Sequence, residues 1–153
     1  LPISANPIQV EGAKFFVGDP HYAQGDGEVS LTALEAPLRA TLTLSVIPQQ
    51  QADALFGERK GPFGYAHGRL LALGLHEDLD EALRRSVDYS VSLLSSLFHL
   101  PAKVIYLYLS AAADFDVSQA VDLVRGVHSR ILLSHFEGSA AQDFVNFVTE
   151  MMR

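Results

Sequence analysis

The chain contains no cysteine and no tryptophan. The absence of cysteine excludes disulfides, thiolate-bound zinc and a cysteine nucleophile. Charged residues make up only 19% of the 153 residues and hydrophobic residues 48%, so a disordered chain is excluded because there is ample apolar surface to bury. We therefore expect residues 1–153 to form a single globular domain, with an N-terminal segment, 1–37, that is partly irregular.

Basic residues are scarce as well. Eleven Lys and Arg stand against 18 Asp and Glu, which gives a net charge of −7 with neutral histidines. This charge repels phosphate backbones and anionic lipids, so we expect no nucleic acid and no membrane among the partners. The longest purely apolar run, 104–109, is far shorter than the ~18–20 residues of a membrane span. No signal peptide is visible and cysteine is absent, which favours a cytoplasmic protein.

Three segments have the pattern of helices. Pro48 precedes a short helix over 49–56, because proline suits the first turn of a helix. The longest helix is expected over 79–98, where Asp78 and Glu81 form a capping pair. Its core-facing stripe is expected to consist of Leu79, Leu83, Val87, Val91, Leu94 and Phe98. Ser139 and Gln142 cap a last helix.

Other segments have the pattern of strands. Strict alternation over 38–47 predicts a strand with one buried face, and the unbroken apolar run 103–110 predicts an interior strand. A helix over 117–129 and a strand over 130–135 follow, which makes a right-handed parallel crossover the expected connection. Less regular patterns suggest short strands at 13–17 and 28–31 and a short helix at 69–75. The expected fold is α+β, with a single mixed β-sheet, an antiparallel N-terminal part, a C-terminal βαβ unit, and helices packed mainly on one face.

The glycine-rich loop from Gly57 to Arg69 concentrates positive charge. Glycines let backbone amides approach a ligand, and cationic side chains attract anions. We expect Arg59, Lys60 and Arg69 to hold an anion there. The remaining members of this candidate ligand-binding site are Phe63 or Tyr65, which would stack on a ring, and His67, which would transfer protons. The loop contains neither a P-loop nor a G-x-G-x-x-G motif.

A second polar group occupies the sequence GDPHYAQGDGE. Its carboxylates and imidazole, Asp19, His21, Asp26 and Glu28, lie close enough to hold a divalent cation. The calcium-loop pattern is not met, however, and no H-x-x-x-H pair exists in the chain. We therefore interpret this group as a solvated turn and expect no metal and no cofactor.

Three further polar residues lie at the predicted ends of a strand or a helix, where functional groups are often found. Asp114 and Asp116 follow the predicted strand 103–110, at the strand end where ligands bind in α/β sheets. His128 would lie near the C-terminus of the predicted helix 117–129, where a charged imidazole interacts favourably with the helix dipole. Ordinary structural roles, as turn and helix-end residues, are the favoured interpretation for all three.

No catalytic constellation is recognisable, and the nucleophile motifs G-x-S-x-G and S-x-x-K are absent. The leading expectation is a non-catalytic binding or protein-interaction domain, such as a bacterial accessory or regulatory protein, whose acidic surface pairs with another protein. The alternative is a small enzyme that acts on a phosphorylated or otherwise anionic small molecule through the loop from Gly57 to Arg69. A homo-oligomer is a further alternative.

Overall fold

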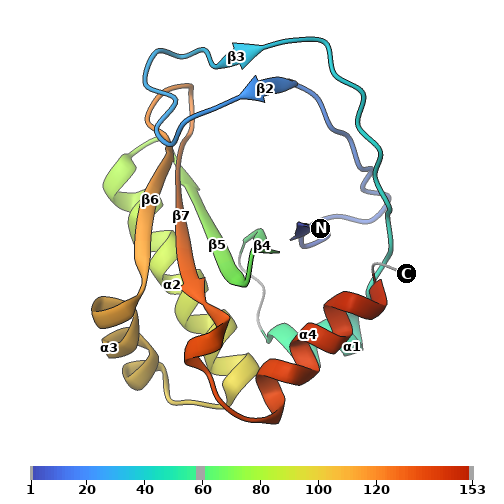
Figure 1. Ribbon diagram of the computed structural model, residues 1–153, viewed down its shortest axis with the longest axis vertical. Coiled ribbons are helices and arrows are strands. Elements are labelled where there is room, and N and C mark those ends of the chain that lie inside the picture. Colours follow the sequence, from blue (N-terminus) through green and yellow to red (C-terminus); the bar gives the residue numbers. More distant parts are fainter. Residues whose placement is uncertain (1, 58–60, 152–153) are drawn as a thin grey trace.

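A computed structural model of the chain describes residues 2–57 and 61–151, which form an α+β fold with one main sheet (Figure 1). Its five strands run antiparallel to their neighbours in the order β1-β4-β5-β7-β6. These strands are β1 (Ile3–Ala5), β4 (Phe63–Ala66), β5 (Arg69–His76), β6 (Asp114–Gln119) and β7 (Arg125–Leu132). Two very short strands, β2 (His21–Ala23) and β3 (Leu34–Glu35), pair separately. The helices are α1 (Gln49–Phe56), α2 (Leu79–Phe98), α3 (Ala102–Ala112) and α4 (Ser139–Met151), with a 3₁₀ turn at Leu133–His135.

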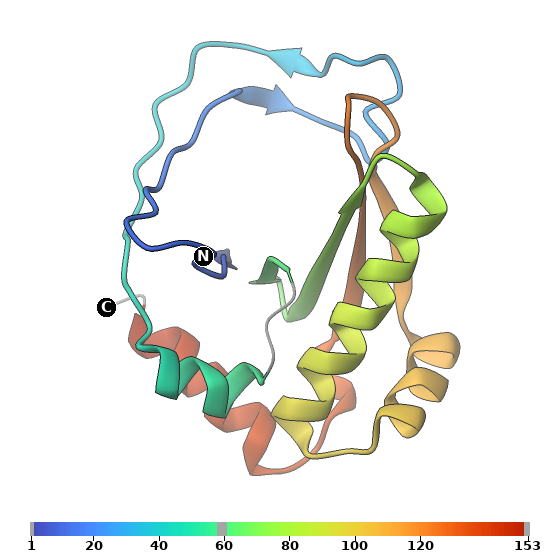
Figure 2. The ribbon, with the colours of Figure 1, turned by 180° about the vertical axis from the view of Figure 1, so that it is seen from behind.

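Helix α2 lies along one face of the sheet (Figure 2). Asp78 caps it, since its Oδ1 accepts the Glu81 amide at 2.9 Å. Gly74 on β5 makes a close approach possible, because a Cβ at that position would lie 2.1 Å from the carbonyl oxygen of Ala82. The helix therefore buries small residues against the sheet and larger ones towards its C-terminal end.

The apolar core lies where α2 meets α1 and α4. Phe56 of α1 is 3% exposed and packs its ring 4.6 Å from that of Phe63. Ile105 and Leu109, one turn apart on α3, are the residues that anchor this helix to the core. No single helix among the described residues is long and apolar enough to span a membrane; α2 and α3 pass that test only as a pair bent by 116°.

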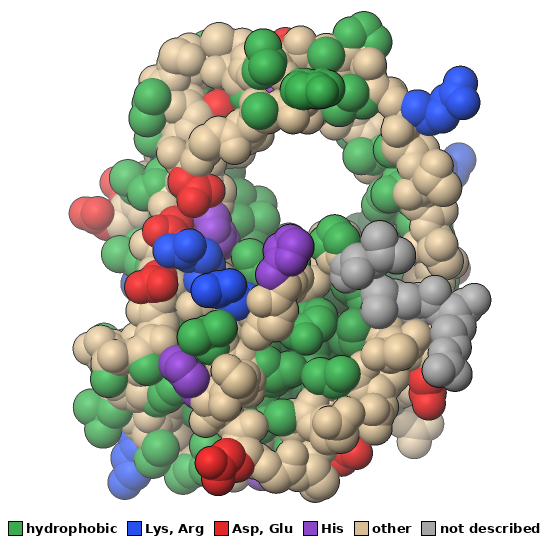
Figure 3. Space-filling model, in the orientation of Figure 1, with side chains coloured by type: hydrophobic (Ala, Val, Ile, Leu, Met, Phe, Trp, Pro, Cys, Tyr) green, Lys and Arg blue, Asp and Glu red, His purple; other side chains and the backbone are tan. Residues whose placement is uncertain are grey.

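Residues 6–48 form an arch that leaves the sheet after β1, carries β2 and β3, and returns to α1 (Figure 1). An opening passes between this arch and the rest of the molecule, and apolar side chains are visible along the arch (Figure 3). Every residue from 37 to 46 is exposed. The arch touches the sheet again near Gly27, which bridges to Gln119.

The structure confirms three predicted helices: those over 49–56 and 79–98, and the one that begins at Ser139. The stripe of the long helix is only partly right. Leu94 is fully buried but Leu83 is 41% exposed, because the sheet-facing side of α2 carries Ala82, Ser86 and Ser90 instead.

The predicted interior strand 103–110 is wrong, since this segment is helix α3. An apolar run does not distinguish a buried strand from a helix by periodicity alone. Here Pro101 stands at the helix N-cap, and only Ile105 and Leu109 are buried, while Tyr106 and Leu107 are 61% and 69% exposed.

The predicted βαβ unit is also wrong. The segment predicted as a helix, 117–129, forms most of the β6–β7 hairpin, and the segment predicted as a helix at 69–75 is strand β5. No parallel βαβ unit occurs within the residues described. The hairpin turns at Asp122, whose φ of 67° is left-handed, a conformation that aspartate tolerates better than most residues.

In the arch, the predicted strands 13–17, 28–31 and 38–47 are not formed. The alternation over 38–47 is real, but a strand needs a neighbour to pair with and an apolar layer to cover its inner face. Neither stands beside 38–46 in the described part of the chain, so both faces of these residues stay exposed, while Ile47 at the end of the segment is partly buried against the core.

Candidate functional site

A row of polar side chains lies on the face of the sheet opposite α2. Ser129 of β7 points towards α2, since its Oγ lies 3.0 Å from that of Ser90. Side chains alternate along a strand, so its neighbours His128 and Arg130 point to the opposite face. The register of the β6–β7 hairpin places Asp116 opposite His128. Figure 3 shows acidic, basic and histidine side chains gathered on this face below the arch.

The arch adds a third group to this row. The Gly27 amide donates to the Ser118 carbonyl at 3.2 Å, and the Ala120 amide donates to the Gly27 carbonyl at 2.8 Å. Gly27 has φ +97°, a conformation that favours glycine. This contact brings Asp26 to β6, where Asp26, Asp116 and His128 each offer a ligand atom within 4.8 Å of the others.

The neighbours of this cluster hold its members in place. Nδ1 of His128 lies 2.8 Å from the Ser118 hydroxyl, which leaves Nε2 for another partner. Nε of Arg130 forms an ion pair with Oδ2 of Asp116, and its NH2 group lies 3.5 Å from Oδ2 of Asp114. A histidine with one ring nitrogen fixed by a hydrogen bond is typical of metal ligands, because the bond sets the tautomer and the orientation of the ring.

Two carboxylates and one imidazole at this spacing match the chemistry of a divalent cation site. Zn²⁺ binds such oxygen and nitrogen donors, and catalytic zinc sites use three protein ligands and leave the fourth position to water. The Asp26–Asp116–His128 cluster thus has the composition of a site that activates water.

A second cluster centres on His21 within the arch. Nδ1 of His21 lies 2.8 Å from Oε1 of Gln24, and Nε2 lies 3.2 Å from Asp19 and 4.0 Å from Glu35. The hydrogen bond to Gln24 raises the pKa of His21, and the charges of Asp19, Glu28 and Glu35 add to the increase against a smaller opposing effect of burial. A protonated imidazole here joins β2 to β3.

The anion site expected from the sequence is only partly described by the structure. Arg59 and Lys60 lie outside the described residues. The ring of Phe63 contacts Phe56, and the ring of Tyr65 lies 5.5 Å from that of Phe144, so both aromatics contribute to the core.

Of the two other members of that expected site, His67 lies in the turn of the β4–β5 hairpin and Arg69 is the first residue of β5. His67 is exposed and has φ +50°. Anion binding by the loop from Gly57 to Arg69 stays a prediction.

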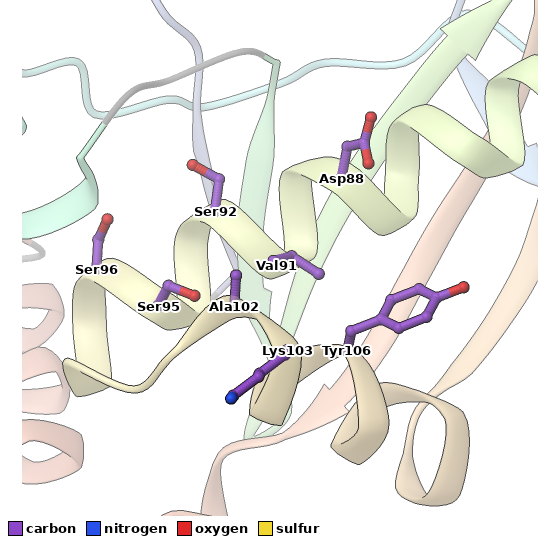
Figure 4. A pocket seen from close by; sticks show the side chains of 8 residues that line it. All are labelled: Asp88, Val91, Ser92, Ser95, Ser96, Ala102, Lys103 and Tyr106. Carbon is purple, nitrogen blue, oxygen red and sulfur yellow. The ribbon is translucent and has the colours of Figure 1, made fainter.

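An open groove of about 700 Å³ lies between α2 and α3 (Figure 4). It is lined by Asp88, Val91, Ser92, Ser95, Ser96, Ala102, Lys103 and Tyr106. The Ser95 hydroxyl is buried and has no hydrogen-bond partner among the described residues. The groove is formed by different elements from those of the Asp26–Asp116–His128 cluster.

Sequence reasoning noted Asp26, Asp116 and His128 one at a time but did not join them. A helix over 117–129 keeps Asp116 and His128 more than three turns apart, whereas the hairpin places them opposite each other. The alternation of polar residues in D-F-D-V-S, 114–118, is the signal that could have revealed the hairpin.

Solved structures with a similar fold exist. The crystal structure of an acetamidase from Bacillus halodurans matches with a TM-score of 0.57 and 20% identity, over 76% of this chain and 37% of that chain. A protein described as a predicted acetamidase/formamidase from Thermoanaerobacter tengcongensis matches with a TM-score of 0.47 and 21% identity, over 72% and 35% of the respective chains. This chain thus spans little more than a third of these relatives. A search of curated proteins finds no significant match.

The sequence model of one family covers residues 3–133, which include the arch, the hairpin and all three members of the cluster. That family is named for amide-hydrolysing enzymes. The match overturns the expectation of a non-catalytic protein-interaction domain, which rested on the absence of recognised catalytic motifs. By this match over most of its length, the chain belongs to the acetamidase/formamidase family.

Proposed function

We propose that this chain carries the catalytic site of an amide hydrolase that converts small aliphatic amides to carboxylate and ammonia. Family membership and the fold shared with an acetamidase support an enzyme of this class. The observation that carries the proposal is the Asp26–Asp116–His128 cluster, which assembles a water-activating set of ligands from the arch and the hairpin.

Asp26, Asp116 and His128 would hold a divalent cation, which would supply a water molecule acidic enough to give hydroxide near neutral pH. In the overall reaction, water adds to the amide carbonyl carbon, the C–N bond breaks, and the nitrogen takes up one proton of the water and leaves as ammonia. The carboxylic acid formed then releases its proton to ammonia or solvent, which gives the carboxylate. Arg130 orients the Asp116 carboxylate through their ion pair.

Of the two functions considered from the sequence, the family supports the alternative, an enzyme, over an interaction domain. It provides no support for an anionic substrate, since acetamide and formamide are neutral. The substrate class proposed here therefore replaces the phosphorylated or anionic one.

Cation binding is tested first. The chelator-treated protein is titrated with Zn²⁺ and with Mn²⁺ by calorimetry, and we expect binding of one ion that weakens by ~10-fold or more in Asp26→Asn, Asp116→Asn and His128→Gln. Asp122→Asn, a change in the exposed β6–β7 turn, is the matched control and should bind like the parent. Equal binding by all four variants would place any cation elsewhere.

Activity is tested next, by ammonia release from acetamide and formamide by the cation-loaded protein. The three cluster variants should lose ~100-fold or more in rate, because general acid–base or metal assistance contributes at least that much. A parent protein that binds the cation and releases no ammonia from either amide would overturn the proposed reaction. Unchanged rates in the cluster variants would overturn the proposed site.

A further inference from the structure

Ser118 of β6 is an extra residue in the ladder that joins β6 to β7. Val117 is paired with Val127 and Gln119 with the adjacent residue Gly126, so the ladder passes over Ser118. Such a bulge frees a residue from the regular pairing of a sheet and turns it towards new partners, often beside an active site. The partners of Ser118 therefore indicate what the bulge contributes.

The backbone and the side chain of Ser118 contact both parts of the chain that supply the Asp26–Asp116–His128 cluster. The Ser118 carbonyl accepts the Gly27 amide at 3.2 Å, which holds the neighbouring Asp26 close to β6. The Ser118 hydroxyl lies 2.8 Å from Nδ1 of His128 in a partly buried place. Ser118 thus links the arch to the histidine of the hairpin.

Gly126 leaves room for the Ser118 side chain. A Cβ at position 126 would lie 3.3 Å from the Cβ of Ser118 and 3.3 Å from a methyl carbon of Leu75, closer than side-chain carbons ordinarily approach. Gly126 is buried, so these neighbours have little space to move away. The φ angle of Gly126 is not left-handed, so backbone freedom is not what this position requires. The space that its two neighbours need accounts for the glycine.

We propose that Ser118 is a positioning residue of the cation site, whose hydroxyl accepts a hydrogen bond from Nδ1–H of His128 so that Nε2 binds the ion. A neutral imidazole carries one proton, and the nitrogen that binds a cation must be the unprotonated one. With the proton held on Nδ1 by the hydroxyl at 2.8 Å, the lone pair of Nε2 is available. This inference rests on the proposed function, since it requires a cation at the Asp26–Asp116–His128 cluster.

Calorimetric titration with Zn²⁺ tests whether the hydroxyl contributes to affinity. Ser118→Ala should bind the ion ~10-fold or more weakly than the parent, because the loss of such a partner typically costs 10–100-fold. Ser118→Thr retains a hydroxyl and should restore most of the affinity. Ser129→Ala is the matched control, because it removes a buried hydroxyl from the strand of His128 on the face that packs against α2. This control should bind Zn²⁺ like the parent.

Nitrogen NMR of the zinc-loaded protein tests the geometry, because a purely structural role of Ser118 would not select one ring nitrogen. In the parent, Zn²⁺ should be bound to Nε2 of His128, and the proton on Nδ1 should exchange slowly with solvent. Ser118→Ala should lose this slow exchange, and Ser118→Thr should regain it. The signals of His128 are identified by their loss in His128→Gln.

The outcomes separate this inference from the proposed function. If His128→Gln weakens zinc binding but Ser118→Ala does not, or if Zn²⁺ is bound to Nδ1, the role of Ser118 is overturned and the cation site stands. A loss of affinity that Ser118→Thr does not restore, or that Ser129→Ala shares, also overturns the role of Ser118. If His128→Gln binds Zn²⁺ like the parent, or the parent binds none, the role of Ser118 is overturned together with zinc binding at this cluster.

Discussion

Ser129 shows how one hydroxyl can replace part of a sheet ladder. Strands β5 and β7 pair Leu70 with Ile131 and Leu73 with His128. Between these pairs, the Ala72 amide donates to Ser129 Oγ at 2.9 Å. The same hydroxyl lies 3.0 Å from Ser90 Oγ, so a row of hydrogen bonds crosses the buried interface between the sheet and α2. Since every group in this hydrogen-bonded row has a partner, the row stabilises one arrangement of helix and sheet.

We predict that Ser129→Ala lowers the free energy of unfolding by about 1–3 kcal/mol, because it leaves the buried Ala72 amide without an acceptor. Denaturant unfolding measures the change. Ser110→Ala, on the exposed side of α3, is the control and should stay within about 0.5 kcal/mol of the parent. A loss at Ser129 no larger than the control would mean that water or a backbone carbonyl replaces the hydroxyl.

His21 should titrate above its ordinary pKa of 6.5, because a hydrogen bond to Gln24 and three nearby carboxylates favour the protonated ring. A raised pKa stabilises the β2–β3 pair below pH 6.5, and this contribution is lost as the pH rises through the folded-state value. Titration of the ring protons by NMR measures it. Gln24→Ala should lower the pKa, and Gln51→Ala, a glutamine on α1, should not. A value at or below 6.5 in the parent would contradict the described contacts.

At the level of elements, the sequence predicts the helices whose first turn carries a clear start signal, a capping residue or a proline. Asp78 marks the start of α2, and Pro48 and Gly57 bound α1. The hairpin of β6 and β7 was predicted as a helix, because Val117, Val121 and Val124 also recur at helical spacing. What decides between the two is tertiary pairing with β5, and no local pattern contains that information.

Gly74 sets the distance between strand β5 and helix α2. We predict that Gly74→Ala costs about 1–3 kcal/mol or more, because the added methyl would meet the backbone of Ala82 and Ser86, which cannot rotate away. Thermal and denaturant unfolding give the value. Gly25→Ala is the control, since a Cβ there meets nothing within 4 Å and its φ is not left-handed. A neutral Gly74→Ala would show that α2 shifts away from the sheet at little cost.

At the scale of the whole molecule, the site joins two parts of the chain that the sequence leaves far apart. Asp26 belongs to the arch, while Asp116 and His128 belong to the hairpin about 90 residues later. The sequence singles out each of these polar residues, but they come together only because the hydrogen bonds of Gly27 hold the arch against β6. This contact between distant parts of the sequence cannot be predicted from local patterns.

Cation binding should therefore fasten the arch to the sheet. The amides of Gly27 and Ala120 cross that junction, and they exchange with solvent only when it opens. If opening releases the ion, a cation at 100 times its dissociation constant should slow exchange of both amides by about 100-fold. The Ala13 amide, which bonds within the arch to Val10, is the internal control and should not change.

Asp26→Asn should abolish the slowing at Gly27 and Ala120. Hydrogen exchange followed by NMR decides the matter: equal slowing at Ala13, or slowing that survives Asp26→Asn, would mean that the ion acts elsewhere than between arch and hairpin.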